Sequence, residues 1–232
     1  MVLPIRTMPV DWRRRKYFPR QKSAILRNVI QTGVVTILSS HGYEPLKFWT
    51  IHPGNGSILR MRTPDVKGLV LEILAPIFCT TYIAAPEDIR MKMDCTMPLL
   101  VLVVEYLEAP FTIEFSVKDS RNMKRKFRLS TCLMSSKLSS LMCHMPLELR
   151  KGWNKVEIDL EGLTMLSYNT NYVEFLMIYI YANCRLRKVY FADQEYDESE
   201  LPVDFNIKKP KIPHKPEENA AFTLYPANLH KE

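Results

Sequence analysis

The stretch NTNYVEFLMIYIYANCRLRKVYFADQEYDESELPVDF, residues 169–205, carries the clearest strand signal in the chain. From 173 to 181 every second side chain is apolar or aromatic, which places these side chains on one face of a β-strand. Most residues between them are apolar too, so we expect this strand to be covered on both faces. A second strand follows at 185–191. Its Leu186 and Val189 are three positions apart rather than two, which indicates a bulge or a local twist.

The rest of the chain between its two ends reads as further short strands separated by turns. The segment 98–106 is almost continuously apolar, as in a central strand, and 111–118 alternates strictly before a hairpin partner at 123–129. We also expect strands at 45–49, 69–74, 80–84 and 152–160, and a strand or a short amphipathic turn at 28–40. A tight turn is expected at 52–56, a Ser- and Met-rich loop at 130–145, and a helix at 160–168. About nine strands with one short helix predict an all-β fold, an antiparallel β-sandwich of the jelly-roll type.

The positive charge of the chain is concentrated at its beginning. The chain has 232 residues and a formal net charge of +7. Residues 1–27 hold eight basic residues and one acidic residue, so the remainder, with 24 of each, is formally neutral. We expect residues 1–27 to be a basic arm that is disordered until it binds a partner, 28–207 to form the folded domain, and 208–232 to be an extended Pro- and Lys-rich tail.

Several function classes are disfavoured by what the sequence lacks. Five cysteines without a CxxC pair argue against a disulfide framework or a zinc module and for a reducing compartment. There is no signal-peptide pattern and no apolar run of about 20 residues, so no membrane partner is expected. The histidines are dispersed, and neither a nucleophile elbow nor a glycine-rich phosphate loop occurs. We therefore expect no catalytic residues, no cofactor or metal, and no enzyme activity.

Two groups of cationic side chains are the candidate binding residues. One lies on the predicted hairpin 111–129 and the other on the strand 185–191. Cations side by side on a sheet repel one another, so an acidic partner would stabilise them, whereas the alternative is a solvated strand face. The acidic turn at 193–200 would meet either a basic partner or arginines of this chain. The candidate contacts are Lys124, Arg125, Lys126, Arg128, Arg185, Arg187 and Lys188.

Three blocks within residues 169–205 resemble the CFA20-domain family of cilia- and flagella-associated proteins. They are NTNYVE, YANCRLRKVYFAD and DESELPVDF, and TYIAAPED at 81–88 agrees with the same family. The resemblance covers about residues 28–207. Two positions depart from the pattern, since Asn169 stands where a glycine is expected and Ala85 where a cysteine is expected. These departures indicate a divergent or extended member of the family.

The resemblance implies a non-catalytic β-sandwich protein of the ciliary or flagellar axoneme. It implies a place at the inner junction, where the A- and B-tubules of doublet microtubules join, and a role in the stability and motility of the cilium. The implied partners are tubulin, the parkin co-regulated protein and other inner-junction or luminal microtubule proteins. The implied location is the cytoplasm and cytoskeleton, in the axoneme or at the basal body. On this interpretation the seven candidate cations contact tubulin or its neighbours at the junction.

Two other functions are compatible with the sequence. Basic strands beside Tyr190 and Phe191 would also suit a module that binds single-stranded nucleic acid, provided that aromatic and cationic side chains share an exposed face. A carbohydrate-binding sandwich would instead expose Trp49 or Trp153 as a flat platform. Burial of both tryptophans would contradict the carbohydrate hypothesis.

Overall fold

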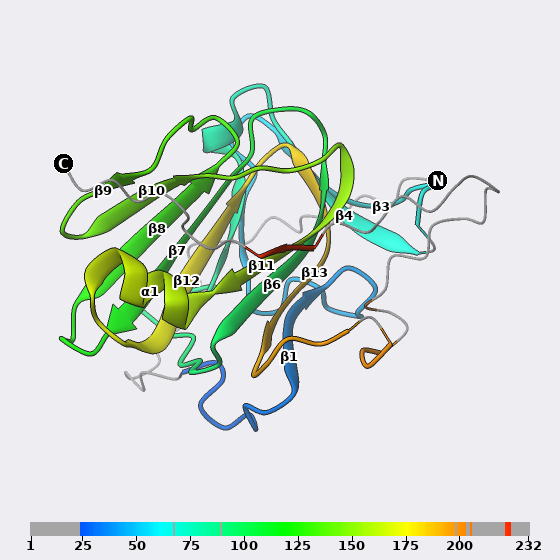
Figure 1. The fold of residues 1–232 in the computed structure, drawn as a ribbon. Helices are drawn as coiled ribbons and strands as arrows, with labels where there is room; N and C mark the ends of the chain where they lie inside the picture. Colours follow the sequence, from blue (N-terminus) through cyan, green and yellow to red (C-terminus); the bar gives the residue numbers. More distant parts are fainter. Residues whose placement is uncertain are drawn as a thin grey trace, which may run out of the picture.

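Two β-sheets packed face to face form the body of the protein (Figure 1). The computed structural model describes residues 24–66, 68–88, 90–197, 199–202, 205 and 221–223. Sheet I has the strand order β14-β11-β6-β13-β4-β3, and β1 also pairs with β13. Its strands are β1 (Val34–Ser39), β3 (Ser57–Arg62), β4 (Leu69–Leu74), β6 (Leu99–Tyr106), β11 (Gly152–Asp159), β13 (Cys184–Ala192) and β14 (Ala221–Thr223).

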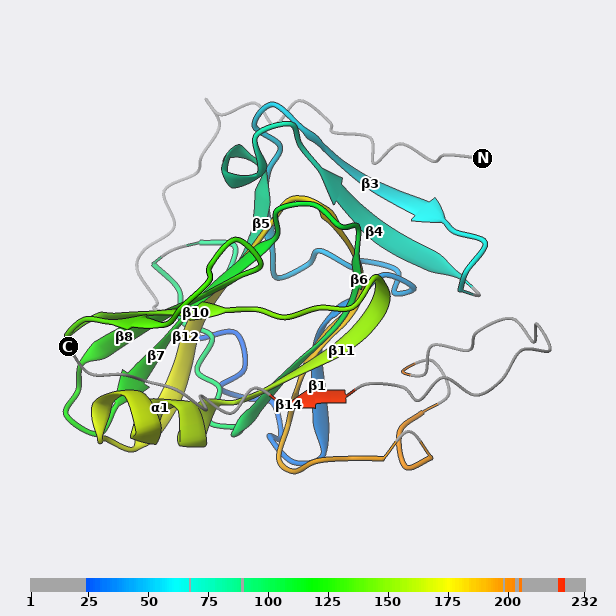
Figure 2. The ribbon, with the colours of Figure 1, turned by 45° about the horizontal axis from the view of Figure 1, so that its top comes forward.

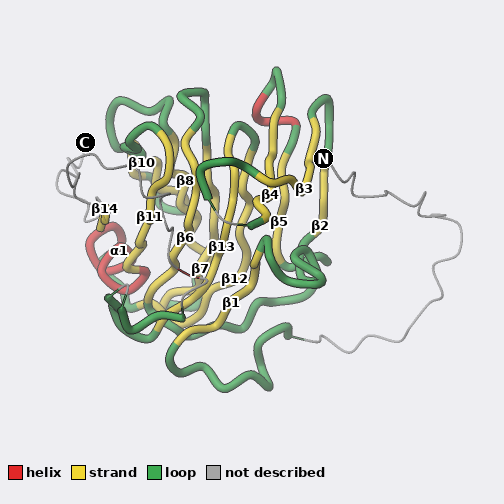
Figure 3. Tube along the Cα trace, turned by 90° about the vertical axis from the view of Figure 1, so that its right-hand side faces the viewer, coloured by secondary structure: helices red, strands yellow, loops and turns green. Residues whose placement is uncertain are grey.

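Sheet II has the strand order β2-β5-β12-β7-β8-β10-β9. Its strands are β2 (Thr50–His52), β5 (Tyr82–Ala85), β7 (Thr112–Asp119), β8 (Lys124–Ser130), β9 (Lys137–Leu138), β10 (Met142–Pro146) and β12 (Tyr172–Tyr181). The 3-10 turn η2 (Phe78–Thr80) precedes β5, and helix α1 (Leu160–Tyr168), which joins β11 to β12, lies at one edge of the sandwich (Figure 3). The expected all-β sandwich with one short α-helix is confirmed.

A large hydrophobic core fills the space between the two sheets. Alternate residues of the central strands supply it, including Leu100, Leu102 and Val104 of β6 and Ile113, Phe115 and Val117 of β7. The ring of Phe115 stacks with the rings of Phe127 and Phe175 at centroid distances of 5.2 and 5.8 Å. Because side chains alternate across a strand, this inward set fixes which residues of β7 and β8 face solvent.

Strand β13 changes its neighbour part-way along, and a bulge marks the change. Its first three residues pair with β4 and its last five pair with β1, while β6 runs along the other side. The register with β6 shifts between Leu186 and Lys188, so Arg187 is the additional residue. Leu186 and Val189 both lie in the core on either side of it. The bulge predicted from the spacing of these two residues is therefore confirmed.

Helix α1 has a polar cap at each end. The Asp159 carboxylate accepts a hydrogen bond from the Gly162 N–H at 2.9 Å. At the other end Asn169 adopts φ 51° and ψ 45°, a left-handed conformation that favours glycine and tolerates asparagine. Its N–H donates to the Met165 carbonyl at 2.9 Å. Asn169 thus meets the backbone requirement that explains a glycine at this position, and the departure from the family pattern leaves the helix end intact.

Two local expectations are wrong. The segment 45–49 is a turn rather than a strand, because Trp49 is drawn into the core, where its indole N–H donates to the Ile37 carbonyl at 2.7 Å. The expected loop at 130–145 contains β9 and most of β10, and β10 pairs with β8 in parallel. Alternate side chains of β10 lie in the core, so a strand is hidden in a composition that is typical of loops.

The expected terminal segments lie mostly outside the described residues. This applies to residues 1–23 of the predicted basic arm and to most of the predicted tail 208–232. Ala24 forms a β-bridge with Lys92, and Leu26 is buried in the core, so the last residues of the predicted arm belong to the folded body. At the other end, β14 pairs in parallel with β11.

Candidate partner-binding surface

The solvent-facing side of sheet II, hereafter the sheet II face, carries the first cationic group. The register places Tyr179 of β12, Glu114 of β7 and Arg128 of β8 opposite one another in one row across the sheet. Lys126 and Lys124 occupy the next two outward positions of β8. Helix α1 contributes its Leu160 and Leu163 to the core between the sheets.

Lys124 and Lys126 are exposed and have no carboxylate partner among the described residues. The Lys124 ammonium lies 3.2 Å from the sulfur of Met177. Partial burial, and then repulsion by Lys126, lower the pKa of Lys124 below its ordinary value. An anion placed against the two ammonium groups would therefore relieve an unfavourable interaction.

The chain itself neutralises two other cations of the sheet II face. Arg128 forms an ion pair with Glu114, which lies directly opposite on β7. The Lys118 ammonium lies 3.4 Å from the Glu174 carboxylate on β12. Cross-strand pairs of opposite charge stabilise a sheet. The repulsion that the sequence predicts along the hairpin is thus offset at these two positions by carboxylates of neighbouring strands.

Arg125 points away from the sheet II face and is buried. Its guanidinium donates to the Asp119 carboxylate at 2.7 Å and to the Ser140 carbonyl, and it lies 4.4 Å from the centroid of the Tyr168 ring. Asp119 also accepts a hydrogen bond from the Met123 N–H at 2.8 Å. Burial raises the pKa of Asp119, but the hydrogen bonds from Met123 and Arg125 outweigh it, so this pKa lies below its ordinary value. Arg125 therefore stabilises the β7–β8 hairpin from its buried side.

On sheet I, Arg185 bridges two carboxylates on the strands at either side. It donates to Glu72 of β4 at 2.6 Å and to Glu105 of β6 at 3.1 Å. Both glutamates lie directly opposite Arg185 in the register and are mostly buried. Burial lowers the pKa of Arg185, but the hydrogen bonds to the two carboxylates outweigh it and raise this pKa above its ordinary value. The Arg185 charge is thus balanced within the chain.

Arg187 and Lys188, at the bulge of β13, are 5% and 2% exposed. The Arg187 guanidinium lies 3.5 Å from the His41 ring nitrogen, and the Lys188 ammonium lies 3.5 Å from the centroid of the Phe205 ring. Strand β13 therefore does not present these two charges to solvent, in contrast to the sequence interpretation. Side chains of the neighbouring segments cover them.

The aromatic residues named for the two alternative functions do not form open platforms. Tyr190 and Phe191 are buried, so neither can stack on a base, and Tyr190 packs edge-on against Phe205. Trp49 is 3% exposed, which contradicts its use as a carbohydrate platform. Trp153 is partly buried and packs against a small cluster on the outer side of sheet I. The nucleic-acid hypothesis thus loses its two aromatic residues, and the carbohydrate hypothesis loses Trp49, whereas Trp153 keeps part of its surface exposed.

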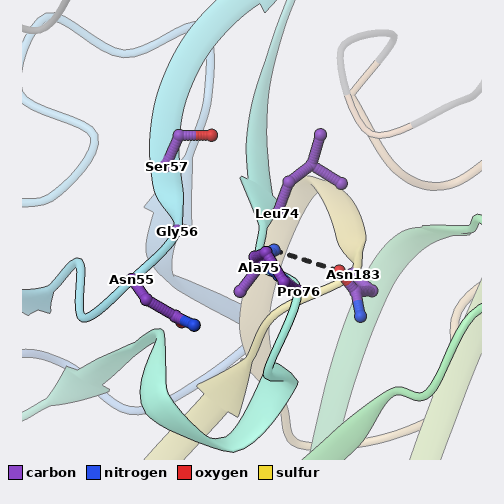
Figure 4. Close-up of a pocket in the computed structure, with 7 residues that line it drawn as sticks. All are labelled: Asn55, Gly56, Ser57, Leu74, Ala75, Pro76 and Asn183. Atoms are coloured by element: carbon purple, nitrogen blue, oxygen red, sulfur yellow. Dashed lines mark hydrogen bonds between the residues drawn. The ribbon is translucent and has the colours of Figure 1, made fainter.

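The described residues outside these charged groups provide little that could act in catalysis or hold a metal ion. A pocket of about 430 Å³ is lined by Asn55, Gly56, Ser57, Leu74, Ala75, Pro76 and Asn183 (Figure 4). The Asn183 side chain accepts a hydrogen bond from the Ala75 N–H at 3.1 Å, and the lining residues include no acid–base pair. No described cluster of His, Cys, Asp or Glu could hold a metal ion, and all five cysteines are free thiols. None of the described helices is long and apolar enough to cross a membrane.

Comparison with known proteins places this chain in a family. The model of the CFA20 domain matches residues 25–209. The chain belongs to the CFA20 domain family. The resemblance seen in the three blocks at 169–205 is confirmed.

Three relatives of this CFA20-domain chain carry the name cilia- and flagella-associated protein 20. The protein of Chlamydomonas reinhardtii is 37% identical over 186 residues, which cover 80% of this chain and 98% of the relative. The protein of Paramecium tetraurelia is 37% identical over 80% of this chain and 97% of its own length. The protein of Caenorhabditis elegans is 36% identical over 80% of this chain and 92% of its own length. A solved exo-beta-agarase aligns with 72% of this chain and 26% of its own, but its TM-score of 0.38 and 8% identity carry no argument.

The structure of the CFA20-domain chain divides the seven candidate cations into three groups. Lys124 and Lys126 are exposed and lack a described carboxylate partner. Arg128 and Arg185 are partly exposed and form ion pairs within the chain. Arg125, Arg187 and Lys188 are buried. The two lysines of β8 are therefore the candidates that the structure leaves open to a partner.

Sequence reasoning on this CFA20-domain chain missed a group of aromatic side chains on the sheet II face. His52 of β2, Tyr82 of β5, and Tyr179 and Tyr181 of β12 contact one another there. The alternation of β12 predicts Phe175 on the same face as Tyr179 and Tyr181, and this prediction is wrong. A register shift between Phe175 and Met177 puts Phe175 in the core and leaves the two tyrosines on the sheet II face. Strands β2 and β5 are short and far away in sequence, so their share could not be read from a local pattern.

Proposed function

We propose that this CFA20-domain chain is a non-catalytic structural protein that binds the microtubules of ciliary or flagellar axonemes. Membership of the CFA20 domain family and the names of its relatives support a ciliary or flagellar protein. In this proposal the chain lies in the cytoskeleton, at the inner junction between the A- and B-tubules. Its partners there are tubulin, the parkin co-regulated protein and other junction proteins, and it supports the stability and motility of the cilium.

The single observation that carries the proposal is the open pair Lys124 and Lys126 on a strand in the middle of sheet II. Neighbouring cations of the same face are neutralised by Glu114 and Glu174, whereas these two are not. Acidic surfaces, such as those of tubulin, are complementary to such a pair. Charges of this kind mainly increase the association rate and set the orientation of the complex, and salt screens them within about 10 Å at 0.1 M.

Reversal of both charges tests this proposal. We expect the double substitution Lys124→Glu and Lys126→Glu to weaken binding to microtubules about tenfold at low salt, because attraction is replaced by repulsion. The difference from the wild type should shrink as salt is raised from about 0.05 M to about 0.2 M. Co-sedimentation over a series of tubulin concentrations gives the apparent dissociation constant in each case.

A matched control separates the position of the charges from the net charge. The double substitution Lys47→Glu and Arg62→Glu changes the net charge equally at two exposed residues, of which Arg62 lies on β3 of sheet I. It should leave binding close to that of the wild type. Equal losses in the two variants, or unchanged binding of the Lys124 and Lys126 variant, would contradict the assignment of this site.

A further inference from the structure

The aromatic patch on the sheet II face consists of His52, Tyr82, Tyr179 and Tyr181. The rings of His52 and Tyr82 stack at a centroid distance of 4.7 Å with an angle of 3° between their planes. Tyr82 meets Tyr179 at 5.6 Å and Tyr181 at 5.5 Å, with angles of 63° and 55°. The three tyrosines are partly exposed, and His52 is exposed. The rings therefore form one contiguous group at the surface.

The aromatic patch and the two open lysines belong to the same face. Tyr82 lies directly opposite both His52 and Tyr181. Tyr179 lies in the same row across the sheet as Glu114 of β7 and Arg128 of β8. Adjacent strands are about 4.8 Å apart, so β12 and β8 are separated by about 10 Å. A segment of a few residues crossing the sheet would reach both the aromatic patch and the lysines. The Glu114–Arg128 pair between them is neutral overall.

The geometry of the rings favours a protein partner over a nucleic acid. Nucleic-acid platforms offer open ring faces on which successive bases stack, together with a row of cations that follows the phosphates. Here one face of Tyr82 is covered by His52, Tyr82 meets Tyr179 and Tyr181 at angles of 63° and 55°, and Arg128 and Lys118 are neutralised. Tyrosines that combine apolar rings with hydroxyl groups are instead enriched at the energetic centres of protein interfaces.

We propose that the sheet II face is a two-part docking surface for an acidic protein segment that carries a large apolar side chain. Lys124 and Lys126 attract its carboxylates, and the aromatic patch holds its apolar side chain. This inference rests on the proposed function, because it assigns the way in which the same face recognises its partner. The two parts differ in their response to salt, since screening weakens the lysine contacts and leaves the apolar contact almost unchanged.

A peptide experiment on the full chain tests the two parts separately. The probes are two fluorescent peptides, Glu-Glu-Glu-Phe-Glu-Glu and the same peptide with Ala in place of Phe. We expect the wild type to bind the Phe peptide about tenfold more tightly than the Ala peptide, the effect of one well-packed anchor. The variant Tyr82→Ala/Tyr179→Ala should lose this preference and retain the salt dependence. The variant Lys124→Glu/Lys126→Glu should lose most binding of both peptides at low salt.

Thermal unfolding of each variant shows whether the sheet is intact. If the double tyrosine variant does not fold, the single substitution Tyr82→Ala in the short strand β5 replaces it. This variant should also lose the preference for the Phe peptide and retain the salt dependence. Equal affinity of the wild type for the two peptides, or a folded tyrosine variant that keeps the preference, would overturn the inference. Tighter binding of a single-stranded uridine 12-mer, lost in both variants, would also overturn it and assign the face to nucleic acid.

Microtubule binding by the same variants separates this inference from the proposed function. If the peptide preference is as expected but the wild type does not co-sediment with microtubules, the proposed function is wrong and the docking surface stands. If microtubules bind through the lysines but the tyrosine variant binds them and the peptides as the wild type does, the proposed function stands and the aromatic patch is not an anchor.

Discussion

Replacement of Asp119 by alanine should lower the free energy of unfolding by about 4 kcal/mol, because it leaves a buried guanidinium without its partner. The Asp119 side chain is fully buried, and that of Arg125 is 9% exposed. Besides the ion pair at 2.7 Å, Asp119 accepts hydrogen bonds from the Met123 N–H and the Thr170 hydroxyl. The substitution therefore disconnects the β7–β8 turn, the inner side of β8 and the segment after α1 at once.

Urea denaturation of two further variants separates the charge from the hydrogen bonds. Asp119→Asn keeps the size of the side chain and one acceptor, so it should cost less than alanine. The double variant Asp119→Asn/Arg125→Met removes both charges and should recover part of the loss, as expected when the uncompensated charge is the main cause. A loss below about 1 kcal/mol for Asp119→Ala would show that the pair contributes little.

The depressed pKa of Asp119 gives the same interaction a pH dependence. Because the pKa in the folded state lies below the unfolded value of about 3.9, the carboxylate contributes its stability above this value. That contribution is lost as the pH falls through the folded-state pKa. Stability of the wild type should therefore decrease on acidification below about pH 4, and that of Asp119→Asn should decrease less over the same range.

Replacement of Arg185 by methionine should cost about 3 kcal/mol, since two largely buried carboxylates then face each other without a cation. The side chains of Glu72 and Glu105 are 10% and 11% exposed, and that of Arg185 is 25% exposed. This partial exposure places the expected cost at the lower end of the range for buried pairs. Thermal and urea unfolding at neutral pH provide the measurement.

A triple variant provides the control for Arg185. Glu72→Gln and Glu105→Gln in the methionine background remove the unpaired charges and should restore most of the stability. If the triple variant is no more stable than Arg185→Met, repulsion between Glu72 and Glu105 is not the cause. A charge-reversal variant of Arg185 would therefore lose stability, so a loss of binding by this variant would not identify Arg185 as a contact.

The β-sandwich could be predicted from the sequence because its central strands are long and their side chains alternate or are continuously apolar. Strand β4 and helix α1 coincide with their predicted limits, and the bulge of β13 follows from one irregular spacing. The segment 45–49 was misread because local pattern cannot show that Trp49 is drawn into the core. Strand β10 was missed because its inward residues are defined by its pairing with the parallel strand β8, which a local sequence pattern does not show.

The candidate site was predicted less well than the fold, because the sequence does not show which cations have a carboxylate beside them. A run of cations looks the same in sequence whether or not carboxylates of other strands lie beside it. Glu72, Glu105 and Glu114 come opposite arginines only through the strand register. The same holds for the aromatic patch, whose members come from three strands that meet in sheet II. Local pattern identified the two open lysines without distinguishing them from their paired neighbours.

The change of partner along β13 has a consequence for local stability. The β3–β4 hairpin projects from the rest of sheet I (Figure 2), and β4 is joined to β13 through only three residue pairs. Among the described strands, β3 in turn pairs with β4 alone. Backbone amides of such an outlying unit exchange with solvent through partial openings that leave the central strands closed. We thus expect the amides of the edge strand β3 to exchange before those of the central strands, whereas β4, whose Leu71 and Ile73 lie in the core, and sheet II, which carries the docking surface, stay closed.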